Sequence, residues 1–125
     1  MSGRERSSAV DLIAGARDLL RFEGGGSAGL WSRAAAVVGR QALETALDRL
    51  WDKRCPGLDV ASARCQLACL PFFLEDDALA RRAASAWASL SDAVHYDGGL
   101  APLPLEVEAW LLDAWEIANR FAALP

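Results

Sequence analysis

The side chains best suited to proton transfer are a serine and a histidine four residues apart, Ser91 and His95. His95 is the only histidine in the chain, and an imidazole ionises near neutral pH, which suits general acid–base catalysis. Four residues make about one helical turn, so both side chains would point the same way. The alternative is a half-buried histidine at a helix C-terminus, where its charge favours the dipole. Ser91, His95, Tyr96 and Arg82 form a candidate polar site, and no residue is assigned as catalytic.

The three cysteines could bind a metal ion only if their thiols converged. Cys65 and Cys69 are one helical turn apart, but neither forms a C-x-x-C motif, and Cys55 is distant in sequence. Because this is not a zinc-finger spacing, we expect reduced thiols and neither a metal nor a cofactor. The acidic run Glu75–Asp77 is predicted to begin a helix, and Gly24–Gly26 lacks the lysine and hydroxyl residue of a phosphate-binding loop.

Five tryptophans are many for a chain of 125 residues. Trp110 and Trp115 fall on one predicted helix, about 140° apart around its axis, so one of them faces away from the main apolar stripe. One interpretation buries this helix on two sides, with the first helix folded over it. The other predicts a protein–protein interface, where tryptophan is enriched. That interface would comprise Trp110, Leu111, Trp115 and Phe121, and the partner would be a second copy or another protein.

The elements that must position these residues are helices. Alanine, the strongest helix former, fills 25 of the 125 positions, whereas the β-branched residues that strands favour are scarce. Apolar residues recur at three- and four-residue steps, as in amphipathic helices. We predict an all-α fold, a five-helix, mostly antiparallel bundle forming one domain over residues 1–125. The expected helices span approximately residues 8–22, 28–54, 59–70, 76–95 and 105–125.

The first helix is expected to be joined to the rest of the bundle by a hinge. It falls within residues 1–23 and is capped by Ser7 or Ser8. The glycine-rich stretch Gly24–Ser27 carries too much chain entropy for a helix, so it is predicted to be a hinge to the bundle of residues 28–125.

Three further local signals bear on the helices. Gly39 interrupts the second helix and indicates a close helix crossing or a bend. Asp59 or Ser62 is expected to cap the third helix. Pro71 should end that helix at the preceding residue or kink it, which leaves Phe72–Leu74 as an irregular apolar corner.

Charge and composition narrow the functional classes. The net charge is −4, so the chain lacks the basic surface that a nucleic-acid-binding protein usually carries. DNA is not expected as a ligand, and RNA or a nucleotide is not favoured. The polar stretch Met1–Ser8 lacks the apolar core of a signal peptide, and no apolar run could span a bilayer. We therefore expect a cytoplasmic location and no association with a membrane.

A family resemblance lies in the second half of the chain. Taken together, its short motifs resemble those of small HEPN-like helical proteins of actinobacteria and their relatives. The motifs are Ala63-Arg64-Cys65-Gln66-Leu67, Cys69-Leu70-Pro71, Leu79-Ala80-Arg81-Arg82, Ala86-Trp87, Leu90-Ser91, His95-Tyr96, Leu100-Ala101-Pro102 and Trp110.

This resemblance implies a bundle of four to five helices, commonly dimeric, in a toxin–antitoxin or phage-defence setting. Many HEPN proteins are metal-independent RNases that use an arginine four to six residues before a histidine. In this chain that window before His95 contains no arginine, and the nearest one, Arg82, is more than three helical turns away.

Three functions follow as alternatives. The favoured one is a non-catalytic HEPN-like module that dimerises or docks on a partner, because the arginine is missing and the chain is acidic. The second is a metal-independent RNase in which His95 moves the proton and Arg81 or Arg82 of a second copy supplies charge. The third is a helical accessory or regulatory subunit that is similar to HEPN proteins only in architecture.

Overall fold

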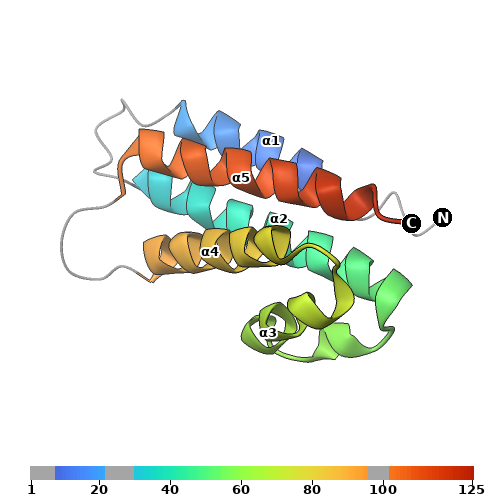
Figure 1. Ribbon diagram of the computed structural model, residues 1–125. Helices are drawn as coiled ribbons and strands as arrows, with labels where there is room; N and C mark the ends of the chain where they lie inside the picture. Colours follow the sequence, from blue (N-terminus) through green and yellow to red (C-terminus); the bar gives the residue numbers. More distant parts are fainter. Residues whose placement is uncertain (1–7, 22–29, 96–101) are drawn as a thin grey trace.

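The computed structural model describes residues 8–21, 30–95 and 102–125, and the regular structure in these ranges is entirely helical (Figure 1). No strand forms within them, which confirms the all-α prediction. The expected hinge Gly24–Ser27 and Tyr96 lie outside the described residues. The helices are α1 (Ala9–Leu20), α2 (Leu30–Arg54), the short 3₁₀ helix η3 (Leu58–Val60), α3 (Ala63–Phe73), α4 (Asp77–Val94) and α5 (Pro104–Ala122).

Three of these helices begin at a short polar side chain that caps the backbone. Ser8 before α1, Ser62 before α3 and Asp76 before α4 each accept a hydrogen bond from the amide three residues ahead, at 3.0, 3.2 and 2.9 Å. Such a bond satisfies one of the amide groups that a helix leaves unpaired at its start. The predicted caps at Ser8, Ser62 and the acidic run are therefore confirmed.

The long helix α2 is central, and it lies against α1, α4 and α5. These four helices run alongside one another, whereas α3 lies at the end where α2 finishes and α4 begins (Figure 1). Gly39 of α2 is at a close crossing: a Cβ atom there would lie 2.6 Å from Cδ2 of Leu111 and 3.3 Å from Cδ2 of Leu90. The crossing predicted at Gly39 is confirmed, since α4 and α5 both reach the backbone at this point.

The end of α3 differs from the prediction. The helix continues through Pro71 to Phe73 instead of stopping before the proline. Proline in the last turn removes only one backbone hydrogen bond, and contacts with α2 compensate. The Phe73 ring packs edge-on against Trp51, with ring centroids 5.4 Å apart, and the Phe73 carbonyl accepts a hydrogen bond from Arg54 at 3.4 Å. Phe72, expected in an apolar corner, is 85 % exposed.

A buried polar contact joins the end of α2 to α3. Trp51 is fully buried, and its Nε1–H donates to Oε1 of Gln66 at 2.9 Å. The amide nitrogen of Gln66 in turn donates to the carbonyls of Asp59 and Ala61, at 3.2 and 2.8 Å. One side chain thereby satisfies groups on α2 and on the segment around η3, which fixes α3 against the bundle.

The helices can also be compared with a membrane span. Among the helices of the described residues, none has the combination of length and low charge that crossing a bilayer requires.

Candidate functional site

His95 ends α4 and has an arginine beside it that the sequence did not reveal. Its backbone amide donates to the carbonyl of Ser91 at 3.0 Å. Its Nε2 lies 3.2 Å from Nη1 of Arg40, which belongs to α2 and is 55 residues away in sequence. A guanidinium group can only donate, so Nε2 is the acceptor and Nδ1 carries the ring proton.

Two further side chains continue this contact between α2 and α4. The Nε atom of Arg40 lies 3.9 Å from Oε2 of Glu44, and the same oxygen accepts a hydrogen bond from Trp87 Nε1 at 3.1 Å. On α4, Trp87, Ser91 and His95 succeed one another at four-residue steps, so they share one face. This face lies beside Arg40 and Glu44 of α2. We define the five residues Arg40, Glu44, Trp87, Ser91 and His95 as the α2–α4 polar row.

The structure places Ser91 and His95 on the same face of α4, but their side chains do not form a hydrogen bond with each other. Ser91 is 7 % exposed, and within the described residues its hydroxyl oxygen has no hydrogen-bond partner. Its neighbour on the same helix face is His95, but the bond between the two residues is made by their backbones.

The structure does not bring Arg82 to Ser91 and His95, because Arg82 belongs to a different contact. It pairs with two carboxylates of α5, Asp113 at 2.9 Å and Glu116 at 3.2 Å. The hydrogen bond to Asp113 raises the pKa of Arg82 above its usual value. Arg82 lies more than three helical turns before His95 on α4. Its side chain contacts α5 and not the α2–α4 polar row. Its role is to hold α4 against α5.

The cysteines do not converge. Cys65 is exposed, Cys55 and Cys69 are partly buried, and all three are free thiols. Across residues 8–21, 30–95 and 102–125, no three histidine, cysteine, aspartate or glutamate side chains are grouped as metal ligands would be.

A groove runs between α1 and α5, which lie side by side in opposite directions (Figure 1). Its middle part encloses about 250 Å³. Arg17 of α1 forms a salt bridge of 3.3 Å with Glu108 of α5 in this part of the groove. The lining of the middle part is Val10, Ile13, Ala14, Arg17, Glu108, Leu111, Leu112 and Trp115. We call this feature the α1–α5 groove.

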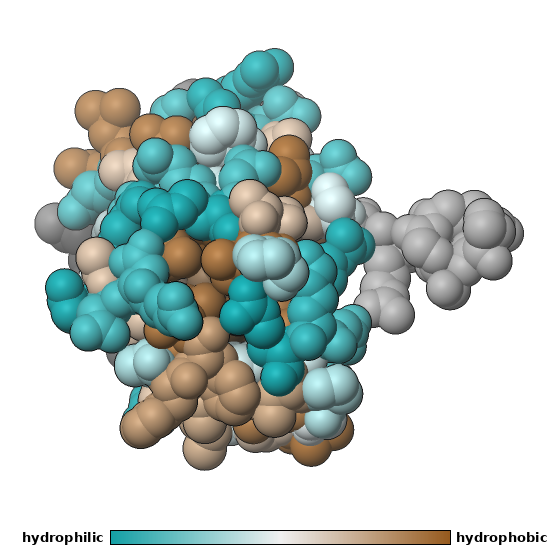
Figure 2. Space-filling view, turned by 45° about the vertical axis from the view of Figure 1, so that its right-hand side comes forward, coloured by the Kyte–Doolittle hydropathy of each residue, from teal (hydrophilic) through white to brown (hydrophobic). Residues whose placement is uncertain are grey.

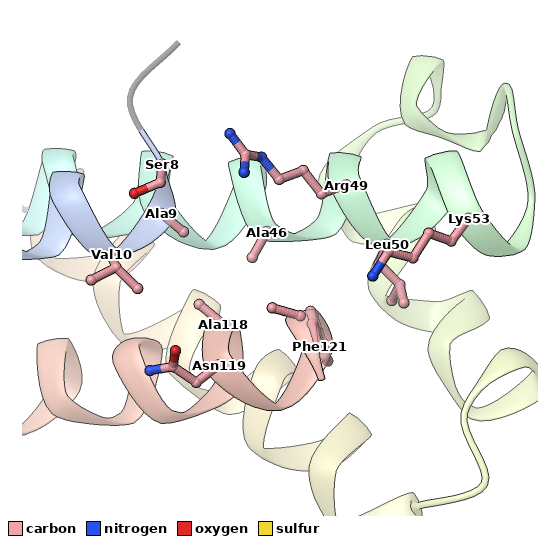
Figure 3. A pocket seen from close by; sticks show the side chains of 11 residues that line it. Ser8, Ala9, Val10, Ala46, Arg49, Leu50, Lys53, Ala118, Asn119 and Phe121 are labelled. Atoms are coloured by element: carbon pink, nitrogen blue, oxygen red, sulfur yellow. The ribbon is translucent and has the colours of Figure 1, made fainter. Parts of the chain in front are cut away.

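A smaller pocket of about 110 Å³ continues the groove where α1 begins and α5 ends. Figure 3 shows Ala46 of α2 and Ala118 of α5 facing one another across it, with Ser8 at its rim. The Arg49 side chain points away from this space (Figure 3). Alanine side chains form part of the lining together with Leu50 and Phe121, and we assign this pocket no polar chemistry.

The predicted interface residues fall into two groups. Leu111 is fully buried and Phe121 is 3 % exposed, so both belong to the core of this chain and are not available to a partner. Trp110 is partly buried against the same core. Trp115, by contrast, is 44 % exposed, and its neighbour Leu112 is 55 % exposed. The first helix does cover one side of α5, but it leaves these two side chains at the edge of the groove.

A second apolar area lies on α3. Figure 2 shows a face on which hydrophilic residues predominate, with apolar residues along its lower edge, at its upper left and in its middle. Phe72 of α3 and Val60 of η3 are the most exposed large apolar side chains of the described residues. This area is distant in sequence from the α1–α5 groove, so a substitution in it can serve as a control for one in the groove.

Comparisons of this chain with protein-family models, with curated proteins and with solved structures found no match. The resemblance to HEPN proteins therefore stays a prediction made from the sequence motifs. The α1–α5 groove and the α2–α4 polar row are the two features of the structure that bear on function.

Proposed function

We propose that the chain is a non-catalytic interaction module that binds a partner protein through the α1–α5 groove. The observation that carries this proposal is the exposure of Leu112 and Trp115 next to an apolar groove. Neighbouring exposed apolar side chains beside a groove are a common feature of protein–protein interaction sites. Tryptophan is also among the residues that contribute most binding energy at the centre of an interface.

The groove suits a helical partner. Its apolar floor is bordered by the charged pair Arg17 and Glu108, the arrangement of an apolar centre with a polar rim that protein interfaces show. An amphipathic helix can place three or four apolar side chains into such a groove over two to three turns. Covering the exposed part of Trp115 would add to the apolar area removed from water.

We extend the proposal to the type of bundle and its setting. A mostly antiparallel, HEPN-like bundle is supported by two helix pairs that run in opposite directions, α1 with α5 and α2 with α4. The toxin–antitoxin or phage-defence setting and the cytoplasmic location rest on the sequence motifs and composition. A regulatory subunit that is HEPN-like only in architecture would use the same groove.

The test is site-specific photo-crosslinking in cells that produce the full chain. A benzophenone amino acid replaces Leu112 in one variant and the exposed Phe72 in the matched control. We expect a crosslinked product, with this chain or another protein, from position 112 and none from position 72. Absence of product at position 112, or equal products at both positions, would contradict a docking role for the groove.

The α2–α4 polar row supports a second candidate function, metal-independent RNA cleavage. Arg40 stands beside His95, so the row brings together the cation and the proton carrier that phosphodiester cleavage uses. Arg40 belongs to another helix, so it lies outside the sequence window before His95. Two observations favour the non-catalytic proposal. The Nε2 atom of the His95 ring is already in contact with Arg40, and the carboxylate of Glu44 partly neutralises the charge of the Arg40 guanidinium.

Purified protein incubated with single-stranded RNA in the presence of a chelator decides between the two. We expect the RNA to stay intact. Cleavage that disappears in both His95→Ala and Arg40→Ala, but persists in Arg82→Ala, would establish the second candidate and refute the first.

A further inference from the structure

The α1–α5 groove has three connected parts, and its charge differs from one part to the next. The pocket of about 110 Å³ shares Val10 with the middle part. The middle part shares Ala14, Arg17 and Glu108 with an open hollow at the far end, where α1 finishes and α5 begins. The charged side chains that line the three parts are Arg17, Asp18, Arg21, Arg49, Lys53 and Glu108. Cations therefore outnumber carboxylates along the groove, although the whole chain has a net charge of −4.

The two carboxylates balance the middle and the far end of the groove. Glu108 pairs with Arg17 at 3.3 Å, and Asp18 pairs with Arg21 at 3.6 Å. Each cation that lines these two parts thus has a carboxylate of its own. A charged side chain of a partner would gain little here, because it would have to compete with an ion pair that already exists.

The end of the groove where α1 begins and α5 ends is different. Its charged side chains, Arg49 and Lys53, are one turn apart on α2, and both are exposed. Within the described residues, neither of them forms an ion pair. The dipoles of α1 and α5 do not offset this charge, because the two helices run in opposite directions and their ends compensate each other. The α1–α5 groove is therefore positive at this end and balanced elsewhere.

Of these two cations, Lys53 is the one placed to contact a partner in the groove. Figure 3 shows its side chain extending along α2 toward the pocket, whereas Arg49 points away from the pocket. The next residue, Arg54, already donates to the carbonyls of Phe73 and Pro125. Lys53 makes no such bond in the part of the chain that the structure describes. Its ammonium group keeps three donors for a partner.

The shape of the groove suits a third helix. Helices pack into the space between two neighbours in a bundle, and α1 and α5 provide such a space on their outer side. Val10 of α1 and both Leu112 and Trp115 of α5 are exposed along it. The 12-residue α1 is about 18 Å long, so a helix of about three turns would span the groove. A flat bilayer surface would touch the rims without filling the middle part.

We propose that the partner is an amphipathic helix with acidic residues at one end only, and that this end lies at Lys53. The proposal rests on the proposed function, whose partner it specifies. Apolar side chains of the partner cover Leu112 and Trp115, and an aspartate or glutamate side chain accepts from the Lys53 ammonium group. The far end of the groove is already balanced, so the partner's other end carries no excess charge. The charge thereby fixes which way the partner lies, because turning it around would move its carboxylates away from Lys53.

An unbiased selection tests the chemistry of the partner. A displayed library of single-helix peptides with randomised surface positions is selected on the full-length protein, and peptides that also bind the Leu112→Glu variant are removed. We expect the selected peptides to have apolar residues in the middle and aspartate or glutamate in the first or the last turn only. Selected peptides without this acidic end would overturn the proposal and leave the docking role of the groove standing. If no peptide depends on Leu112, the docking role is wrong as well.

Charge reversal then tests the contact with Lys53. Lys53→Glu should weaken binding of the tightest peptide about fivefold and remove most of the salt dependence of its affinity. Replacing the acidic residues of the peptide with lysine should restore binding to Lys53→Glu and weaken binding to wild type. The matched control is Arg64→Glu, on an exposed arginine of α3 that lines no part of the groove, and it should leave the affinity unchanged.

Fluorescence anisotropy measures these affinities, and circular dichroism establishes that each variant is folded. Equal affinities of wild type and Lys53→Glu for the peptide would contradict the contact. Phosphatidylglycerol vesicles and sedimentation equilibrium test two other occupants, and we expect neither vesicle binding nor a dimer that depends on Leu112. Vesicle binding lost in both Leu112→Glu and Lys53→Glu would assign the groove to a lipid surface. A dimer that Leu112→Glu dissociates would assign it to a second copy, and either result would overturn the proposal.

Discussion

At the scale of single residues, the most constrained polar group is the side chain of Gln66. It accepts from the buried Trp51 ring and donates to two backbone carbonyls. Removing one partner from a buried hydrogen bond costs more than the bond itself contributes, because the remaining group has lost its water. Gln66 is therefore a structural residue, although its chemistry would also suit a binding site.

We predict that Gln66→Leu lowers the free energy of unfolding by about 2–4 kcal/mol. Leucine fills a similar volume, so the loss reports on the Trp51 N–H and the two carbonyls left unpaired. The matched control is Gln41→Leu on the exposed side of α2, where we expect a change within about 0.5 kcal/mol. Urea unfolding followed by tryptophan fluorescence measures both. Equal midpoints for Gln66→Leu and wild type would contradict the role given to this network.

A contact of the candidate site could be predicted only where its two residues are close in the sequence. The caps Ser8, Ser62 and Asp76 could be predicted because each acts on an amide three residues away. The approach of Arg40 to His95 could not, because it depends on how α2 and α4 pack across 55 residues. For the same reason the ion pairs of Arg82 could not be predicted, since only the packing of α4 on α5 shows that its carboxylate partners are on α5.

At the scale of elements, the two glycines inside helices have opposite surroundings. A Cβ on Gly39 would meet the side chains of Leu111 and Leu90, both of them buried. A Cβ on Gly15 of α1 would meet nothing within 4 Å. Glycine weakens a helix at either position, but only at Gly39 does close approach of two neighbouring helices compensate.

Alanine substitutions should separate these two cases. Gly15→Ala is expected to stabilise the protein by about 0.5–1 kcal/mol, since it only restricts the unfolded chain. Gly39→Ala gains the same helix propensity but must displace Leu111, and overpacking in a core costs about 1–3 kcal/mol, so its net effect should be destabilising. Thermal unfolding monitored at 222 nm ranks the two variants against wild type. A Gly39→Ala variant at least as stable as Gly15→Ala would show that the helices can move apart freely.

The helices themselves were well predicted from periodicity, but their neighbours were not. The proline signal was overridden at α3, because Phe73 packs on Trp51 and its carbonyl bonds to Arg54. On α5 the pattern marked Leu111 and Trp115 as equally apolar. It could not tell which of them faces α2 and which faces solvent, since an apolar residue contributes the same signal in a core and at an interface.

At the scale of the whole molecule, the ion pairs of two arginines join α4 and its cap to α5. Arg82 pairs with Asp113 and Glu116, and Arg120 pairs with Asp76 at 2.6 Å. Asp76 also caps α4, so one carboxylate serves both the start of that helix and its attachment to α5. The backbone amide of Leu79, together with the Arg120 guanidinium, holds the pKa of Asp76 below its usual value of 3.8.

This lowered pKa predicts a pH dependence. A carboxyl group whose pKa is lower in the folded than in the unfolded state stabilises the fold above the unfolded pKa, and the effect is lost as pH falls through the folded value. Stability linked to Asp76 should therefore be complete at neutral pH and decline below about pH 4. Asp76→Asn keeps a capping side chain but cannot ionise. Melting temperatures measured across pH 3 to 7 should fall less steeply for Asp76→Asn than for wild type, and parallel curves would contradict the assignment.

The two sides of α5 also determine how the gene can change over generations. Mutations at Leu111 or Phe121 disturb the folded core and are removed by selection, whereas mutations at the exposed Leu112 or Trp115 leave the fold intact. A lineage could thus alter what this side of α5 presents to its surroundings through a few codons of a single helix, while the inherited scaffold stays the same.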